Sequence, residues 1–190
     1  MEKPEIEWLA QYRKGHVEAL GKLVEHFRRP LSGFILNMTE RHGDADEIFQ
    51  EVWFRATQKM DSYKQKNFLS WLFRIAHNLI IDHARKKKPV MSLQDPKEAR
   101  AFEETMPSLE RGPDEEVHAE HLGQKIKEAT GLLSLEQREV FLMRTENVSF
   151  KEIAKIQKTS INTTLARMQY ALAKLRDALK IEYEELSHEA

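Results

Sequence analysis

The chain has 190 residues, no cysteine, 41% hydrophobic and 32% charged residues, and a formal net charge of −1. This length allows one large or two small domains, and the composition is typical of a helix-rich globular protein. The lack of cysteine excludes disulfides and thiolate metal sites, which suits the reducing cytoplasm where we expect the protein. No apolar run approaches ~18 residues and the first residues lack a signal-peptide core, so we expect no membrane insertion.

The small net charge hides an uneven distribution along the chain. Residues 1–88 carry +4 and residues 123–180 carry +5, whereas residues 89–122 carry −6 and residues 181–190 carry −4. Two basic blocks separated by an acidic segment indicate two contacts with one polyanion. Four of the six prolines lie in residues 89–115, a composition typical of a linker.

The sequence predicts an all-α fold of two small helical domains joined by a flexible acidic linker, the C-terminal domain being a helix-turn-helix. The predicted parts are a first domain, a linker, a second domain and an acidic tail, over residues 1–88, 89–115, 116–181 and 182–190.

The apolar residues at the start of the first domain are spaced as in helices. The pattern of residues 1–15 predicts a short amphipathic helix, and a longer apolar pattern follows over residues 20–38. Pro30 predicts a kink in this pattern or two abutting helices. Gly43 is expected to end it, and Asp44 to open the next helix as a capping box.

The next helix, predicted over residues 45–59, has an acidic face with Phe54 near its centre. The rest of that face is Glu47, Gln50, Glu51 and Gln58. Two interpretations stay open: the face fills a crevice between helices, or it binds a protein through one aromatic anchor. Glu47 and Glu51 have the spacing of a carboxylate metal site, but no Glu-x-x-His motif accompanies them, so no metal site is predicted.

A polar loop over Asp61–Asn67 comes before the chain's central helix. It carries a tyrosine, two lysines and an asparagine, at Tyr63, Lys64, Lys66 and Asn67. Such a loop either holds an extruded base or only connects two helices.

The central helix is predicted over Phe68–Lys88, and its apolar arc is wide enough to place it inside a helical bundle. Its polar stripe carries Arg74, Asn78 and Arg85, with Trp71 at the margin, and it ends in three lysines. Cations bind phosphates and flat rings stack on unpaired bases, so this stripe suits an unpaired strand. The alternative is a core helix whose terminal lysines suit the helix dipole.

The second domain has three serine caps, at Ser134, Ser149 and Ser160, which predict three successive helices. The last two helices, joined by the turn at residues 157–159, make a helix-turn-helix. The expected inner face of the final helix is Ile161, Leu165, Met168, Leu172 and Leu175. Its outward arc suits a major groove and consists of Asn162, Thr163, Ala166, Arg167, Tyr170 and Lys174.

Three segments in this order resemble the extracytoplasmic-function sigma factors of bacterial RNA polymerase, which keep the second and fourth conserved sigma regions. Asp44–Ala56 resembles their core-polymerase-binding helix. Phe68–Lys88 resembles their melting and minus-ten recognition helix, and Leu133–Leu179 their helix-turn-helix for the minus-thirty-five element. The recognition helix has fewer basic residues than the family pattern.

The resemblance implies a sigma factor whose partners are core RNA polymerase, promoter DNA and an anti-sigma factor, with no cofactor. The implied polymerase-binding residues are Asp44, Glu47, Gln50, Glu51 and Phe54. The implied minus-ten residues are Tyr63, Lys64, Lys66, Asn67, Trp71, Arg74, Asn78, Arg85, Lys86, Lys87 and Lys88. The implied minus-thirty-five residues are Ser160, Asn162, Thr163, Ala166, Arg167, Tyr170 and Lys174.

No nucleophile–base pair, glycine-rich phosphate loop or metal-ligand cluster occurs in the sequence, so no catalytic activity is predicted. Two alternatives remain at this point. A helix-turn-helix regulator that acts without polymerase would explain the second domain but not Asp44–Ala56. A helical adaptor would bind proteins only. Co-purification with core polymerase, with and without promoter DNA, separates the three.

Overall fold

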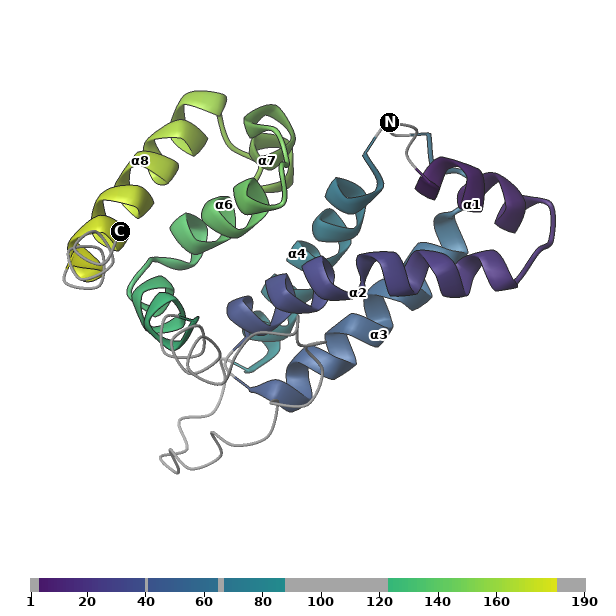
Figure 1. The fold of residues 1–190 in the computed structure, drawn as a ribbon, viewed down its shortest axis with the longest axis horizontal. Helices are drawn as coiled ribbons and strands as arrows, with labels where there is room; N and C mark the ends of the chain where they lie inside the picture. Colours follow the sequence, from purple (N-terminus) through teal and green to yellow (C-terminus); the bar gives the residue numbers. More distant parts are fainter. Residues whose placement is uncertain (1–3, 40, 65–66, 88–122, 181–190) are drawn as a thin grey trace, which may run out of the picture.

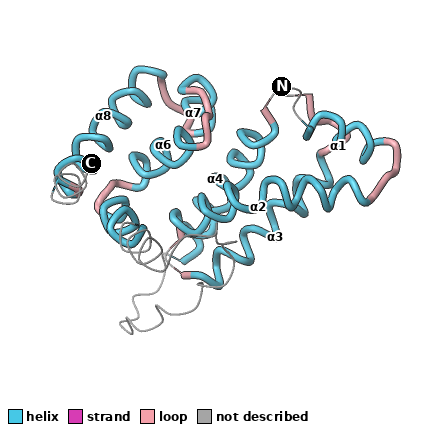
Figure 2. The backbone as a smooth tube through the Cα atoms, in the orientation of Figure 1, coloured by secondary structure: helices cyan, strands magenta, loops and turns pink. Residues whose placement is uncertain are grey.

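The computed structural model describes residues 4–39, 41–64, 67–87 and 123–180, apart from the side chains of His42 and Lys87. These residues form α-helices and the turns between them, and no strand occurs among them (Figures 1 and 2). The all-α prediction is therefore confirmed. Several predicted features lie outside the described residues: Lys66, Lys88, the linker over 89–115 and the tail over 182–190.

Four helices form the N-terminal bundle: α1 (Pro4–Arg13), α2 (Glu18–Met38), α3 (His42–Lys59) and α4 (Phe68–Lys87). Their apolar faces meet in one buried core, which includes Leu23, Leu31, Ile35, Val52, Leu72 and Phe73. The predicted central helix is confirmed as α4, which packs against both α2 and α3. Burial of its wide apolar arc contributes to the hydrophobic stabilisation of this bundle.

Helix α2 continues through Pro30 as a single helix, so the alternative of two abutting helices is wrong. A proline in a helix removes one backbone hydrogen bond. Phe27 and Leu31, on either side of it, are both buried, and their packing holds the helix together across the missing bond.

The predicted start of α3 is also wrong. The helix begins at His42 rather than after Asp44, and its N-cap residue Arg41 makes no side-chain cap. Gly43 thus lies inside α3, and Asp44 lies in the first turn, where its negative charge suits the helix dipole.

Aromatic rings gather where the loop after α3 meets the start of α4. The ring centroid of Phe68 lies 5.3 Å from that of Phe27, 5.2 Å from that of Tyr63 and 5.3 Å from that of Trp71. The rings of Tyr63 and Trp71 lie 4.8 Å apart. Burial raises the pKa of the Tyr63 phenol above its ordinary value, with Glu5 and Glu152 adding to the shift, so the ring stays neutral.

The C-terminal helices are a stretch at residues 123–131, then α6 (Leu135–Thr145), α7 (Phe150–Ile156) and α8 (Ile161–Ala178). The capping boxes at Ser134 and Ser149 are confirmed, since each hydroxyl accepts a backbone N–H three residues later. Helices α7 and α8 are joined by the predicted short turn, in which Lys158 has a φ of 53°.

The inner face of α8 differs from the prediction. Leu175 is buried as predicted, but the other buried residues are Thr164 and Ala171, and the predicted Ile161, Leu165 and Leu172 are exposed. Thr164 and Ala171 are small, so α6 and α7 can approach the axis of α8 closely on that side.

The two sets of helices share one buried apolar cluster. Helix α6 packs on α2 and α7 packs on α4, so the C-terminal helices lie along one side of the N-terminal bundle (Figure 1). Val148, Ile153 and Ile156 belong to the same cluster as the core of α2 and α4. Apolar contact therefore holds the two domains together in this structure.

Candidate nucleic-acid and protein interfaces

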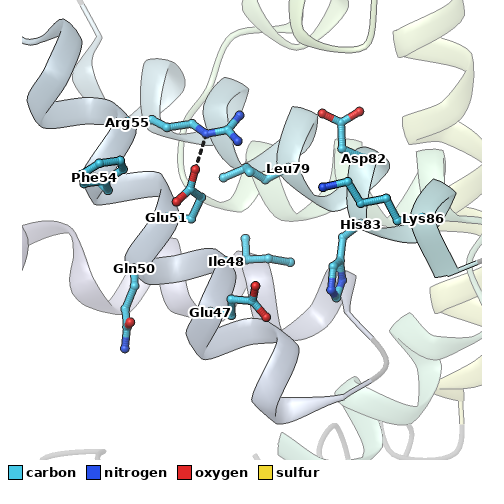
Figure 3. A pocket seen from close by; sticks show the side chains of 10 residues that line it. All are labelled: Glu47, Ile48, Gln50, Glu51, Phe54, Arg55, Leu79, Asp82, His83 and Lys86. Carbon is cyan, nitrogen blue, oxygen red and sulfur yellow. Dashed lines mark hydrogen bonds and ion pairs between the residues drawn. The ribbon is translucent and has the colours of Figure 1, made fainter.

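A groove of about 430 Å³ lies between α3 and α4, on the face predicted to bind a protein (Figure 3). Phe54 stands at one end of this groove with 59% of its surface exposed, so it fills no crevice between helices. Glu47 and Gln50 are exposed on the same helix. Glu51 accepts a hydrogen bond from Nε of Arg55 at 2.6 Å, which holds its carboxylate in the groove wall.

Helix α4 supplies the other wall of this groove through Asp82, His83 and Lys86. Nε2 of His83 lies 4.0 Å from Oδ1 of Asp44, so Asp44 faces α4. Among the residues described, no three His, Asp or Glu side chains come together as a metal site would require. An acidic face with one exposed aromatic ring suits a partner surface that is basic and partly apolar.

The polar stripe of α4 is exposed at Arg74, Asn78 and Arg85. Nδ2 of Asn78 donates to the backbone oxygen of Arg74 at 2.9 Å, and Arg85 pairs with Asp82 at 3.1 Å. Both interactions lie on the surface, where an incoming phosphate or base can replace them at little cost. This stripe has the groups that an unpaired strand needs, cations and a planar amide.

Two residues predicted for the minus-ten contact are buried in this structure. Trp71 is 5% exposed and Tyr63 is 9% exposed, and each packs against the other in the aromatic cluster. In this conformation neither ring has a free face on which a base could stack. Nearby, Lys64 is exposed, while Oδ1 of Asn67 accepts the Ser70 N–H at 3.0 Å and caps α4.

The start of α8 has the predicted cap: Oγ of Ser160 accepts the Thr163 N–H at 3.0 Å. The predicted outward residues are exposed at Asn162, Thr163, Tyr170 and Lys174, and half-buried at Ala166 and Arg167. Arg167 points back to the turn, where its Nη1 donates to Oε1 of Gln157 at 2.7 Å.

Sequence reasoning missed a set of linked polar residues whose buried members, His77 and Glu139, bridge the two domains. Nδ1 of His77 on α4 lies 2.5 Å from Oε1 of Glu139 on α6. The other oxygen of Glu139 accepts Nε2 of Gln157 at 2.6 Å, and Gln157 in turn accepts Arg167. We name His77, Glu139, Gln157 and Arg167 the interdomain network. A second groove, of about 500 Å³, lies along it.

Comparisons with known proteins identify the family of both parts of the chain. The family model for sigma-70 region 2 matches residues 23–90, and that for sigma-70 region 4 matches residues 123–175. The chain is 29% identical over 178 residues to the ECF RNA polymerase sigma factor SigW of Bacillus subtilis, which covers 90% of this chain and 95% of SigW. It is 30% identical over 169 residues to the RNA polymerase sigma factor NccH of Alcaligenes xylosoxydans xylosoxydans, covering 88% and 90% of the two chains.

The fold is shared with a solved sigma factor. The sigma factor RpoE of Bartonella quintana, in its complex with the anti-sigma factor NepR, aligns with a TM-score of 0.63 and 22% identity over 87% of this chain and 99% of its own. The family models and the relatives thus identify a sigma factor, and the shared fold is consistent with this. The chain belongs to the extracytoplasmic-function sigma factors, the group 4 members of the sigma-70 family, which bind core RNA polymerase and direct it to promoters.

Proposed function

We propose that three separate surfaces of this sigma factor divide the work of initiation: the α3 face binds core polymerase, the α4 stripe captures the minus-ten strand, and α8 reads the minus-thirty-five duplex. The corresponding domains are residues 1–88 and 116–181. The observation that carries the proposal is the exposed aromatic side chain of Phe54, which stands among carboxylates in a groove. An exposed ring does not stabilise the fold, so its place in this groove favours a role in binding.

Docking on the polymerase requires a surface that is open in the free protein. Phe54, Glu47 and Gln50 meet this requirement, because all three are exposed. A central aromatic anchor supplies most of the binding energy, while the acids around it steer the encounter and select a basic partner.

Capture of the minus-ten strand uses the exposed stripe of α4. Arg74 and Arg85 bind phosphates, and Asn78 offers its amide to a base edge. Promoter opening follows because an extruded base gains these contacts, which offset the lost pairing and stacking. Lys86, Lys87 and Lys88 extend the phosphate contact without reading sequence.

Reading of the minus-thirty-five duplex falls to the outer face of α8. Asn162, Thr163 and Tyr170 are exposed polar or amphipathic side chains on the outer part of this helix. Arg167 is the group able to make a bidentate contact to guanine, once it is released from Gln157.

An anti-sigma factor is a further proposed partner. RpoE of Bartonella quintana forms a complex with the anti-sigma factor NepR. We expect this chain to bind an anti-sigma factor as well, in the cytoplasm, where its polymerase and promoters are. No helix in the described ranges is long and apolar enough to cross a membrane.

Reconstituted transcription tests the proposed function directly. The chain mixed with bacterial core polymerase and a library of randomised promoters should yield transcripts that share an upstream and a minus-ten motif. Core polymerase alone is the control and should yield none. Binding to duplex DNA without any polymerase-dependent transcription would instead identify a helix-turn-helix regulator, and binding to polymerase without DNA selection would identify an adaptor.

Arg167→Ala should relax selection at the upstream motif by about 1–3 kcal/mol at one base pair, because a bidentate arginine–guanine contact is worth that much. The minus-ten motif should stay unchanged. Arg176→Ala is the matched control, since it removes the same charge from an exposed position on α8. If the minus-ten motif changes instead, the two DNA contacts have been assigned to the wrong domains.

A further inference from the structure

Helix α1 belongs to the N-terminal bundle but lies outside the match to sigma-70 region 2, which begins at residue 23. It packs along α2 (Figure 1), with Leu9 buried and with Trp8 and Tyr12 partly buried against the core of the bundle. The ring centroid of Trp8 lies 5.4 Å from that of His26 on α2. A helix that is fixed in this way can hold a neighbouring segment in position.

Arg13, in the last turn of α1, reaches the segment between α3 and α4. Its Nη2 donates to the backbone oxygen of Met60 at 2.9 Å and also to that of Tyr63, and its Nε donates to the Met60 oxygen at 3.3 Å. The Tyr63 N–H donates to the same Met60 oxygen at 3.2 Å, which closes a turn over residues 60–63. Arg13 therefore joins the two ends of this turn from a position 47 residues before Met60.

The turn at residues 60–63 is held through its backbone and through a side chain. Met60 is the C-cap residue of α3, and the last carbonyl oxygens of a helix have no partner within the helix. A guanidinium at this end supplies donors and a positive charge that suits the helix dipole. The ring of Tyr63 is in turn buried against Phe68 and Trp71. Arg13 thus fixes the backbone of a residue whose side chain the aromatic cluster already fixes.

The loop before α4 has a second anchor at Asn67, whose Oδ1 accepts the Ser70 N–H at 3.0 Å. Lys64 lies between these two anchors in the sequence and is exposed. A phosphate contact tolerates movement of a lysine, whereas a hydrogen bond to a base edge needs its donor at a defined distance and angle. Base selection by this loop therefore requires that the turn before Lys64 is fixed.

We propose that Arg13 is a positioning residue for minus-ten recognition: it fixes the turn before Lys64, so that Lys64 meets the extruded base at one defined place. The proposal rests on the minus-ten contact proposed above for the N-terminal domain. Arg13 acts through the loop, since its guanidinium donates to backbone oxygens of the protein. Minus-ten recognition thus extends to a helix outside the residues matched to region 2.

The first test compares bases within one preparation of holoenzyme reconstituted with core polymerase. Transcription from promoters that differ at single minus-ten positions gives a ratio of the selected base to the others, in which the folded fraction of the protein cancels. Arg13→Ala should lower this ratio at least about fivefold at one position, the position at which Lys64→Ala also lowers it. Because both substitutions act on one contact, the double variant should be no worse than Lys64→Ala alone.

Lys14→Ala is the matched control, since it removes the same charge from the exposed residue next to Arg13. It should leave every base ratio within about twofold of the wild type. If Arg13→Ala weakens transcription from all promoters and leaves the ratios unchanged, Arg13 has a structural or phosphate-binding role and the proposal is overturned. Effects of the two single substitutions that multiply in the double variant would overturn it as well.

Hydrogen exchange of single amides in the free chain, followed by NMR, tests the turn without polymerase or DNA. Arg13→Ala should accelerate exchange of the Tyr63 amide at least about fivefold, because the turn that this amide closes loses its clamp and opens more often. The amide of Leu31, which is buried in α2, should exchange as in the wild type.

The two measurements separate the role of Arg13 from the proposed function. Unchanged exchange at Tyr63 would overturn the role of Arg13 even where the wild type directs transcription. If instead the wild type directs no transcription although Tyr63 exchange responds to Arg13→Ala, the proposed function is wrong, and the minus-ten role of Arg13 is overturned with it.

Discussion

Phe54→Ala combined with Glu51→Lys is expected to weaken binding to core polymerase by about 2–4 kcal/mol, or about 30- to 1,000-fold in dissociation constant. The first substitution removes the exposed aromatic anchor and the second reverses a charge beside it. Because Phe54 is 59% exposed and Glu51 half-buried on the surface of α3, the folded state should lose little stability. Competition with the wild type for fluorescently labelled core polymerase measures the difference.

A matched double variant controls for net charge and surface hydrophobicity. Ile6→Ala with Glu7→Lys changes an exposed apolar residue and an adjacent acid on α1, outside the α3 groove. It should bind core polymerase as the wild type does. If the α3 variant keeps wild-type affinity while remaining folded, the docking surface lies elsewhere on the molecule.

Local signals in the sequence gave reliable predictions where the physics is local. The capping boxes at Ser134 and Ser149 need only a serine and an acceptor three residues later, and both formed as predicted. The apolar arc of Phe68–Lys88 correctly placed α4 inside the bundle. An apolar pattern that repeats over several turns determines which face of a helix is buried.

Predictions that depend on neighbouring elements failed. The inner face of α8 was expected at its large apolar residues, yet the helix turns Thr164 and Ala171 inward and leaves Leu165 exposed. The sequence cannot state how closely α6 and α7 approach. Likewise, His77 and Glu139 are 62 residues apart in sequence, and nothing in either segment indicates that the two side chains meet.

Trp71 and Asn78, both predicted to contact the minus-ten strand, are expected to differ sharply when replaced by alanine. Trp71 is buried against Tyr63 and Phe68, so Trp71→Ala should lower the free energy of unfolding by about 3–5 kcal/mol. That is a large part of the 5–15 kcal/mol typical of a domain, so the variant should melt far below the wild type. Thermal and denaturant unfolding followed by circular dichroism measures the loss.

Asn78→Ala should leave the free energy of unfolding nearly unchanged and reduce promoter opening. Asn78 is exposed, and among the described residues its side chain bonds only to the Arg74 oxygen within its own helix, so stability should change by no more than about 0.5 kcal/mol. Promoter opening should fall about tenfold, since one hydrogen bond to an extruded base is worth about 1–1.5 kcal/mol. Permanganate reactivity of minus-ten thymines in the polymerase complex reports opening. Wild-type opening by Asn78→Ala, on duplex and pre-melted templates alike, would mean that the polar stripe of α4 is a solvated surface and that the strand is captured elsewhere.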